Sequence, residues 1–179
     1  DVDNDGFYDL FIPDGVASRL YRNRTDGTFE DITAAAGLSG LDGVSVGVFA
    51  DYDNDGYKDL FVSRTYKHNQ LFHNNGNANH WIELDLVGVN SDRDATGARI
   101  SATANGVTQY RVQDGRYHRW SQDSRRIHCG LAGATAADIT VKWPSGVVQT
   151  FPNVTANTLY QVTEDAAAPV PVALGVAPP

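Results

Sequence analysis

The sequence lacks the features that mark several large classes of protein. Its single cysteine, Cys129, excludes an internal disulfide; we expect a small core residue, and the alternative is a bond to another chain. No apolar run approaches the roughly 20 residues that a membrane-spanning helix needs. The 14 basic residues are outnumbered by 22 acidic ones, which argues against a nucleic-acid partner. There is no Gly-x-Ser-x-Gly elbow, phosphate-binding loop or zinc-binding helix motif, so we do not expect an enzyme.

The acidic residues are concentrated in two short segments. These segments, which we call loop 1 (residues 1–9) and loop 2 (residues 51–59), hold eight aspartates between them: Asp1, Asp3, Asp5, Asp9, Asp51, Asp53, Asp55 and Asp59. Their eight negative charges equal the formal net charge of -8. The acidity is therefore local, and the rest of the chain is close to neutral.

The acidic loops belong to an internal repeat. Residues 1–12, Asp-Val-Asp-Asn-Asp-Gly-Phe-Tyr-Asp-Leu-Phe-Ile, return at residues 51–62 as Asp-Tyr-Asp-Asn-Asp-Gly-Tyr-Lys-Asp-Leu-Phe-Val. Each loop leads into a short expected strand (10–12 and 60–62), followed by a turn and a second strand (19–23 and 70–74). Further strands are expected between the loops, at 28–33 and 44–50. Ala34 to Ala36 predict a helical turn that Gly37 closes. A repeat of about 50 residues with four short strands is typical of a propeller blade.

The spacing of the aspartates predicts a metal site in each loop. Carboxylates held in one tight loop repel one another, each close pair costing about 1 kcal/mol or more, unless a cation lies among them. Calcium accepts roughly six to eight oxygen ligands in flexible geometry, whereas magnesium demands an octahedron. Gly6 and Gly56 allow the positive φ that turns the chain around an ion. We therefore expect two Ca²⁺ sites, with ligands from the eight aspartates and from the backbone carbonyls of Phe7 and Tyr57.

EF-hand and dockerin-type interpretations of the loops do not fit. An EF-hand begins in the same way but needs a glutamate at position 12, where Ile12 and Val62 stand. Asn4 and Asn54 lie between the aspartates, and we expect them to stabilise the turn rather than to bind metal.

The second half of the sequence has a different pattern. Residues 81–87 alternate apolar and polar side chains, as a half-buried strand does, and Asn105-Gly106 is a hairpin signal. Further strands are expected at 98–104, 107–112, 138–143, 147–151 and 159–162. The predicted fold class is all-β. It comprises propeller-type calcium-loop repeats over 1–79, which form an incomplete propeller, a β-sandwich over 80–164 and an Ala/Pro-rich tail over 165–179.

On these residues the chain resembles two known families. The acidic loops resemble the calcium loops of FG-GAP or VCBS repeats, and residues 46–53 resemble the strand that enters such a loop. The second half resembles an ASPIC and UnbV domain, which follows these repeats in cartilage acidic protein-like secreted proteins. The matching segments are Asn79-His-Trp81, Gly97-Ala-Arg99, Ser121-Gln122, His128-Cys-Gly-Leu131 and Trp143-Pro-Ser-Gly146. The resemblance implies a secreted, calcium-binding β-protein.

A propeller needs several blades, and this chain holds fewer than two. Exposed sheet edges and faces need cover. We expect either that the chain is part of a longer precursor or that neighbouring subunits cover these surfaces. The leading hypothesis is a calcium-binding extracellular structural or adhesive protein that forms a homo-oligomer or polymer, such as a fibre or sheet. The alternatives are a carbohydrate-binding fragment of a secreted propeller, with a glycan or extracellular protein partner, and an enzyme whose active site lies in missing blades.

Two sequons give a weaker signal. Asn23-Arg-Thr and Asn153-Val-Thr fit the acceptor pattern for N-glycosylation, so Asn23 and Asn153 are candidate sites in a host that glycosylates secreted proteins. A chain of this length often carries one or two such tripeptides by chance.

A basic stretch and the histidines carry no defined chemistry. The stretch contains Arg116, Arg119, Arg125 and Arg126, and it reads either as a solvated loop or as a docking face for an acidic partner. Trp120 within it is a candidate for stacking on a sugar, although a core or interface position fits as well. The five histidines show no metal-ligand spacing, and we expect them in turns or interfaces.

Overall fold

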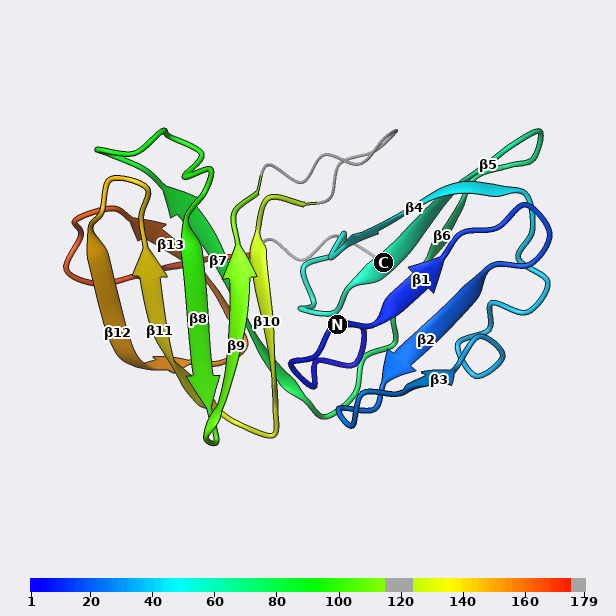
Figure 1. Cartoon of the computed structure of the whole chain (residues 1–179), viewed down its shortest axis with the longest axis horizontal. Coiled ribbons are helices and arrows are strands. Elements are labelled where there is room, and N and C mark those ends of the chain that lie inside the picture. The colour runs from blue at the N-terminus through cyan, green and yellow to red at the C-terminus, as the bar shows by residue number, and fades with distance from the viewer. Residues whose placement is uncertain (115–123, 175–179) are drawn as a thin grey trace.

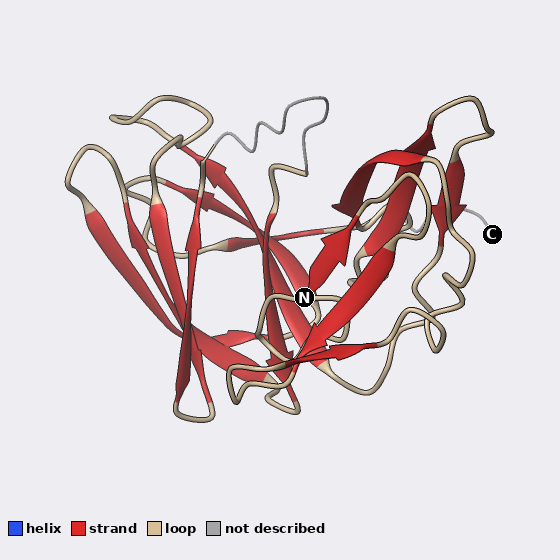
Figure 2. Ribbon diagram, turned by 45° about the vertical axis from the view of Figure 1, so that its right-hand side comes forward, coloured by secondary structure: helices blue, strands red, loops and turns tan. Residues whose placement is uncertain are grey.

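Every regular element is a β-strand in the part of the chain that the structure describes (Figures 1 and 2). The structure is a computed structural model, and it describes residues 1–114 and 124–174. The all-β prediction is confirmed. Among the described residues there is no helix with the length and apolar character needed to cross a membrane.

The first half of the chain folds into two three-stranded antiparallel sheets. Their strand orders are β1-β2-β3 and β4-β5-β6, and we call them together the repeat half. The bounds are Leu10–Ile12 (β1), Arg19–Asn23 (β2), Phe29–Asp31 (β3), Val44–Ala50 (β4), Asp59–Arg64 (β5) and Gln70–Phe72 (β6). Within the described residues these sheets do not close into a barrel, which is consistent with the predicted incomplete propeller.

The boundaries of the sequence repeat differ from those of the sheets by one strand, because β4 belongs to the first repeat but to the second sheet. The first repeat holds four strands, as predicted, but β4 pairs with β5 of the second repeat across loop 2, from Ala50↔Asp59 to Val44↔Arg64. The expected helical turn is a single turn, in which Ala36 N donates to Ile32 O (2.8 Å) and Gly37 adopts φ 72°. A small core joins the two sheets and contains Leu20, Leu38, Leu41, Val44, Leu60 and Val62.

The second half is a sandwich of two four-stranded sheets. Their orders are β10-β7-β13-β14 and β12-β11-β8-β9, and we call them together the sandwich. The bounds are His80–Val87 (β7), Arg99–Ala104 (β8), Val107–Val112 (β9), Ile127–Ala132 (β10), Ala136–Lys142 (β11), Val148–Thr155 (β12), Thr158–Thr163 (β13) and Val170–Val172 (β14). β13 runs parallel to β7, whereas the other neighbours are antiparallel.

The large hydrophobic core lies between the two sheets of the sandwich. It includes Ile82, Ile100, Ile139 and Cys129, each at most 1% exposed. Cys129 therefore occupies the core position expected from the sequence, and Trp143 lies in the same core. Two strands were not predicted: β10 and β14. Because β14 pairs with β13, part of the segment interpreted as a tail belongs to the fold.

Glu164, immediately after β13, holds one end of the sandwich together. Its carboxylate accepts hydrogen bonds from the backbone N–H groups of Val89, Asn90 and Ser91, at 2.7–2.8 Å. The hydroxyl groups of Ser91 and Ser145 also donate to it. Burial alone would raise the pKa of Glu164, but these hydrogen bonds outweigh it and hold the pKa at about 2.

Replacing Glu164 by glutamine is expected to lower the free energy of unfolding of the sandwich by about 3 kcal/mol at pH 7, because several bonds to a charged acceptor are lost. Folding lowers the pKa of Glu164 from 4.5 to about 2, so the contribution of its charge is complete above pH 4.5 and is lost as the pH falls towards 2. Denaturant unfolding of both proteins at pH 7 and pH 3 measures this. The difference in the free energy of unfolding between the two proteins should be smaller at pH 3 than at pH 7. Glu30→Gln, on the surface, is the control and should change little. An equal difference in the free energy of unfolding at both pH values would contradict the prediction.

Candidate metal centre

Loop 1 brings three of its four aspartates together. Asp1, Asp3 and Asp5 each place a carboxylate oxygen within 4.8 Å of the other two. The turn is closed by backbone bonds to the same carboxylates, as Gly6 N donates to Asp1 Oδ2 (3.0 Å) and Phe7 N to Asp5 Oδ1 (2.8 Å). Asp1 Oδ1 is buried and has no hydrogen-bond partner among the described residues. One carboxylate oxygen of loop 1 is therefore buried without a hydrogen bond within the described structure.

Loop 2 repeats this geometry. Gly56 N donates to Asp51 Oδ2 (2.9 Å) and Tyr57 N to Asp55 Oδ1 (2.8 Å). Here Asp51, Asp53 and Asp59 place carboxylate oxygens within 4.8 Å of one another. The two loops thus place Phe7 and Tyr57 at equivalent points.

The last aspartate of each loop also ties the loop to the following strands. Asp9 accepts hydrogen bonds from Val2 N and Asn23 N, both at 2.8 Å. Asp59 accepts the equivalent bonds from Tyr52 N (3.0 Å) and Asn74 N (2.8 Å). Asp59 belongs to the cluster of its loop, whereas Asp9 lies outside the cluster formed by Asp1, Asp3 and Asp5.

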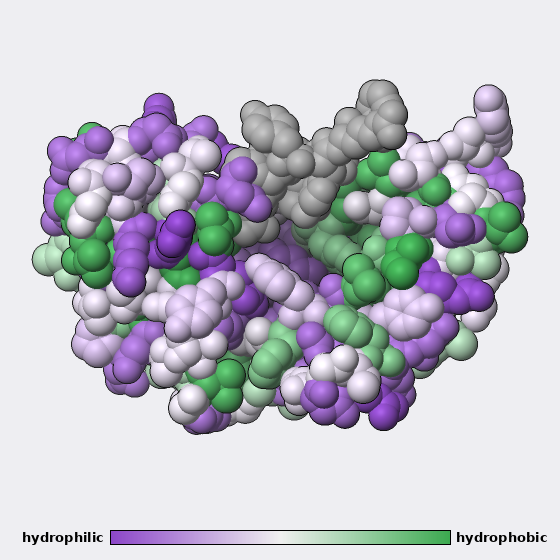
Figure 3. All heavy atoms as spheres, viewed as in Figure 1, coloured by the Kyte–Doolittle hydropathy of each residue, from purple (hydrophilic) through white to green (hydrophobic). Residues whose placement is uncertain are grey.

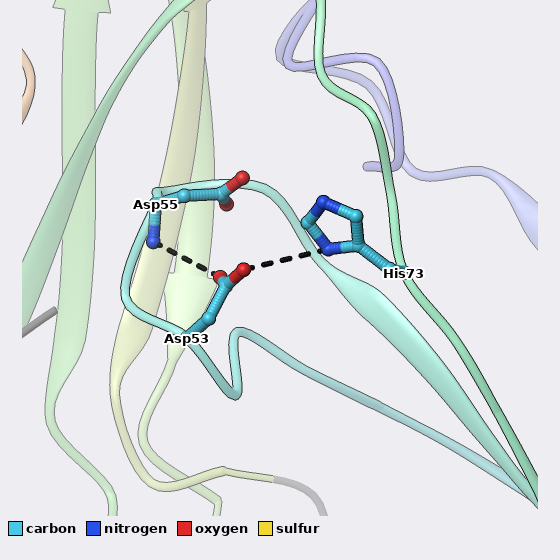
Figure 4. Close-up of side chains that lie close together, drawn as sticks. All are labelled: Asp53, Asp55 and His73. Atoms are coloured by element: carbon cyan, nitrogen blue, oxygen red, sulfur yellow. Dashed lines mark hydrogen bonds and ion pairs between the residues drawn. The ribbon is translucent and has the colours of Figure 1, made fainter. Parts of the chain in front are cut away.

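A histidine joins loop 2, and the sequence analysis did not identify it. Figure 4 shows His73 beside Asp53 and Asp55, with its ring facing the carboxylates. His73 Nδ1 lies 3.4 Å from Asp53 Oδ2 and 3.2 Å from Asp59 Oδ1. The signal was in the repeat, because His73 occupies the position of Arg22, immediately before Asn23 and Asn74.

The environment of both loops disfavours their negative charge. Burial raises the pKa of Asp3, and the charges of Asp5 and Asp9 raise it further. Burial is also the largest cause that raises the pKa values of Asp5 and Asp55, and it raises that of Asp51 to about 6. Crowded, partly buried carboxylates with an all-oxygen donor set in loop 1 fit a hard divalent cation such as Ca²⁺.

Asn4 and Asn54 connect the loops to the rest of the molecule. Both adopt positive φ, 57° and 62°, as expected for residues in the turn. Asn4 Nδ2 donates to Gly56 O (3.0 Å), and its Oδ1 accepts from His128 Nε2 (2.7 Å). Arg126 donates to Asn54 Oδ1 (2.7 Å). The asparagines therefore shape the turns and also join loop 1, loop 2 and the sandwich.

A buried ionic cluster lies beside these contacts. Lys58, from loop 2, approaches Glu83 of β7 at 2.7 Å, and Glu83 is completely buried. Arg126 and His128 each lie 3.4 Å from the same carboxylate. Burial alone would raise the pKa of Glu83, but His128 and Lys58 outweigh it and hold the pKa at about 2. Figure 3 shows hydrophilic side chains at the floor of the hollow between the two halves.

The two sequons have different surroundings. The amide nitrogen of Asn23, to which a glycan would be attached, donates to Tyr8 O (3.2 Å). Asn153 is exposed, with φ 54°, and its backbone N–H donates to Asp138 Oδ1. Glycosylation of either stays a prediction.

Only one end of the basic stretch is described. Arg125 forms an ion pair with Asp94 (2.5 Å), and Arg126 contacts Asn54 and Glu83 as above. Arg116, Arg119 and the candidate sugar-stacking Trp120, with Tyr117 and His118, lie outside the described residues. The docking-face interpretation of these residues stays a prediction.

Two family models match the chain. The FG-GAP-like repeat model matches residues 1–62, which contain both acidic loops, and the ASPIC and UnbV model matches residues 88–169. Their order confirms the resemblance to FG-GAP repeats followed by an ASPIC and UnbV domain, whereas the likeness to VCBS repeats and to cartilage acidic protein stays a prediction. A search of curated proteins found no match. Loop 2 and the sandwich strand β7, which carries Glu83, meet near the boundary between the two matched regions.

Replacing Lys58 by methionine is expected to lower the free energy of unfolding by about 3 kcal/mol, because removing one partner of a buried ion pair leaves the other inadequately compensated. The double variant Lys58→Met/Glu83→Gln should recover more than half of this loss. Lys67→Met, which breaks the exposed ion pair with Asp42, is the matched control and should cost less than about 1 kcal/mol. Denaturant unfolding of the four proteins measures this. Equal losses in Lys58→Met and Lys67→Met would refute the prediction.

Proposed function

We propose that this chain, in which FG-GAP-like repeats precede an ASPIC and UnbV domain, is a secreted protein that binds calcium at loop 1 and loop 2. Both domain types are typical of extracellular or periplasmic proteins. The observation that carries the proposal is Asp1 Oδ1, which is buried without a partner in the described structure, beside Asp3 and Asp5. An uncompensated buried carboxylate oxygen costs about 1–3 kcal/mol or more, and a bound cation removes that cost.

Each loop would supply its own set of ligands. In loop 1 these are Asp1, Asp3 and Asp5, with the carbonyl of Phe7 and with Asp9 also available at the base of the loop. In loop 2 they are Asp51, Asp53, Asp55 and Asp59, with the carbonyl of Tyr57. Calcium would neutralise the carboxylates and stiffen the turns that lead into β1 and β5, so binding would be coupled to folding of the repeat half.

The second part of the proposal is a structural or adhesive role rather than catalysis. The repeat half exposes apolar side chains on its sheets, among them Phe61 and Leu71, which are 43% and 50% exposed and lie opposite each other on β5 and β6. Leu10 and Ile12 are similarly exposed on β1. Such surfaces favour association, and we propose that copies of the chain assemble into a polymer through them.

Isothermal titration with calcium tests the two sites. The wild-type chain is expected to bind two ions. Asp3→Asn and Asp53→Asn should each remove one site or weaken it at least about tenfold, because each neutralises a carboxylate within one cluster. Asp14→Asn and Asp26→Asn, which alter exposed turn aspartates, are the controls and should bind two ions. A wild-type chain that binds no calcium would rule out the proposal.

Sedimentation with calcium and then with chelator tests assembly. Large ordered particles are expected in calcium, and they should dissociate in chelator. Phe61→Ser/Leu71→Ser should reduce the assembled fraction, because the apolar contact is lost. Val148→Ser, which removes an exposed apolar side chain from the sandwich, is the matched control. A small particle in both conditions would be inconsistent with self-assembly and would favour a ligand-binding fragment.

A further inference from the structure

Loop 1 packs directly against β10 of the sandwich. A Cβ atom placed on Gly130 would lie 2.3 Å from Asp1 Oδ2 and 2.6 Å from two backbone atoms of Asn4. The register of β10 shifts between Gly130 and Ala132, and Ala132 N donates to Asn4 O (2.8 Å). Bulges commonly redirect a backbone group in this way. Only a residue without a side chain at position 130 leaves space for this approach of loop 1.

Arg111, from β9, fixes the same loop from a second direction. Its guanidinium is buried and lies 4.2 Å from the centre of the Tyr8 ring. Nη2 contacts Gly6 O (3.4 Å) and approaches Asp1 Oδ2 (4.0 Å), while Nε donates to His128 O of β10 (3.0 Å). The guanidinium of Arg111 therefore connects β9 and β10 of the sandwich to both ends of the Asp1–Gly6 turn.

Loop 2 also meets the sandwich, and its contact positions 54 and 56 are equivalent to positions 4 and 6 of loop 1, which contact the sandwich too. Its contacts are made by Asn54 to Arg126, by Gly56 to the indole of Trp81 and by Lys58 to Glu83. These residues lie between the aspartates. In loop 1, by contrast, the sandwich packs on the carboxylate of Asp1, whose side chain is only 2% exposed.

We propose that the sandwich is a structural part of the first calcium site. By holding Asp1 through Gly130 and Arg111, it raises the calcium affinity of loop 1, whereas no described contact from the sandwich holds a carboxylate ligand of loop 2. The inference rests on the proposed calcium function and goes beyond it. It states that the second domain positions a ligand in one of the two repeated sites but not in the other. A ligand held in place before binding does not pay the ordering cost when the ion arrives.

The coupling acts in both directions. If docking of the sandwich raises the affinity of loop 1 for calcium, calcium in loop 1 strengthens docking by the same factor. Calcium would then set how firmly the repeat half and the sandwich are joined. The Ala132 amide, which donates to Asn4 O across the junction, is a direct reporter of that contact.

The test is the substitution Gly130→Ala in the full chain. Gly130 does not have a positive φ, so alanine adds a steric clash without backbone strain. Gly133→Ala is the matched control, because Gly133 lies just beyond β10, also lacks a positive φ and has no atom within 4 Å of an added Cβ. Titration with calcium in an Asp53→Asn background measures loop 1 alone, and an Asp3→Asn background measures loop 2.

Gly130→Ala is expected to raise the calcium Kd of loop 1 about tenfold, within the usual range of coupling between sites, and to change that of loop 2 less than about twofold. Gly133→Ala should change neither. Calcium should also slow hydrogen exchange of the Ala132 amide in the parent but not in Gly130→Ala. The Ala134 amide donates to Leu131 O within the sandwich, so its hydrogen exchange should not change with calcium. An unchanged loop 1 Kd in folded Gly130→Ala would overturn the inference.

If Gly130→Ala does not fold, calcium binding will be lost at both loops. In that case Arg111→Lys tests the inference instead. Lysine keeps the positive charge near Asp1 but cannot span Gly6, Tyr8 and His128 as guanidinium does, so a weaker loop 1 reports lost positioning rather than altered charge. The same tenfold rise in Kd is expected, and an unchanged Kd overturns the inference. If the parent chain binds no calcium at loop 1, the proposed function itself fails, and that result is distinct from either outcome.

Discussion

The arrangement of the molecule depends on the side chain of Asn4. It is completely buried and bonds at the same time to Gly56 of loop 2 and to His128 of the sandwich. Its backbone has positive φ, which asparagine tolerates better than most residues, and its carbonyl accepts from Ala132. A buried amide must satisfy its donors and acceptor, so the three segments can pack only in the arrangement that supplies all of these partners. The rest of the junction is built around this contact.

Charge of both signs is concentrated at that junction. The acidic loops, Lys58, Arg111 and the buried Glu83 lie where the repeat half meets the sandwich. Burying charges is unfavourable unless each is compensated, and here part of the compensation for Glu83 comes from Lys58 on the other half. A junction of this kind is sensitive to any added cation, because a metal ion in loop 1 alters charges that the sandwich contacts directly. This links the proposed calcium sites to the geometry of the whole chain.

The local patterns identified most of the fold. The strands β4 and β9 were predicted with their observed bounds, because alternating or β-branched runs lie between clear turn residues. β10 was missed, since Ile127 to Leu131 are all buried and show no alternation, and Cys129-Gly130 does not resemble a strand. His73 was also missed as a neighbour of loop 2, because spacing along the chain does not show that His73, directly after β6, lies beside the loop.

The sequence by itself determined the acidic loops, their repetition and the β-character of both halves. These features depend on spacing within a few residues, and such spacing is preserved whatever the rest of the chain does. Only the tertiary structure decided that Asn4, Gly130 and Glu83 lie at one junction, and that the two similar loops have different surroundings. These contacts join residues between 25 and 129 positions apart, and their geometry is set by the packing of two separate hydrophobic cores.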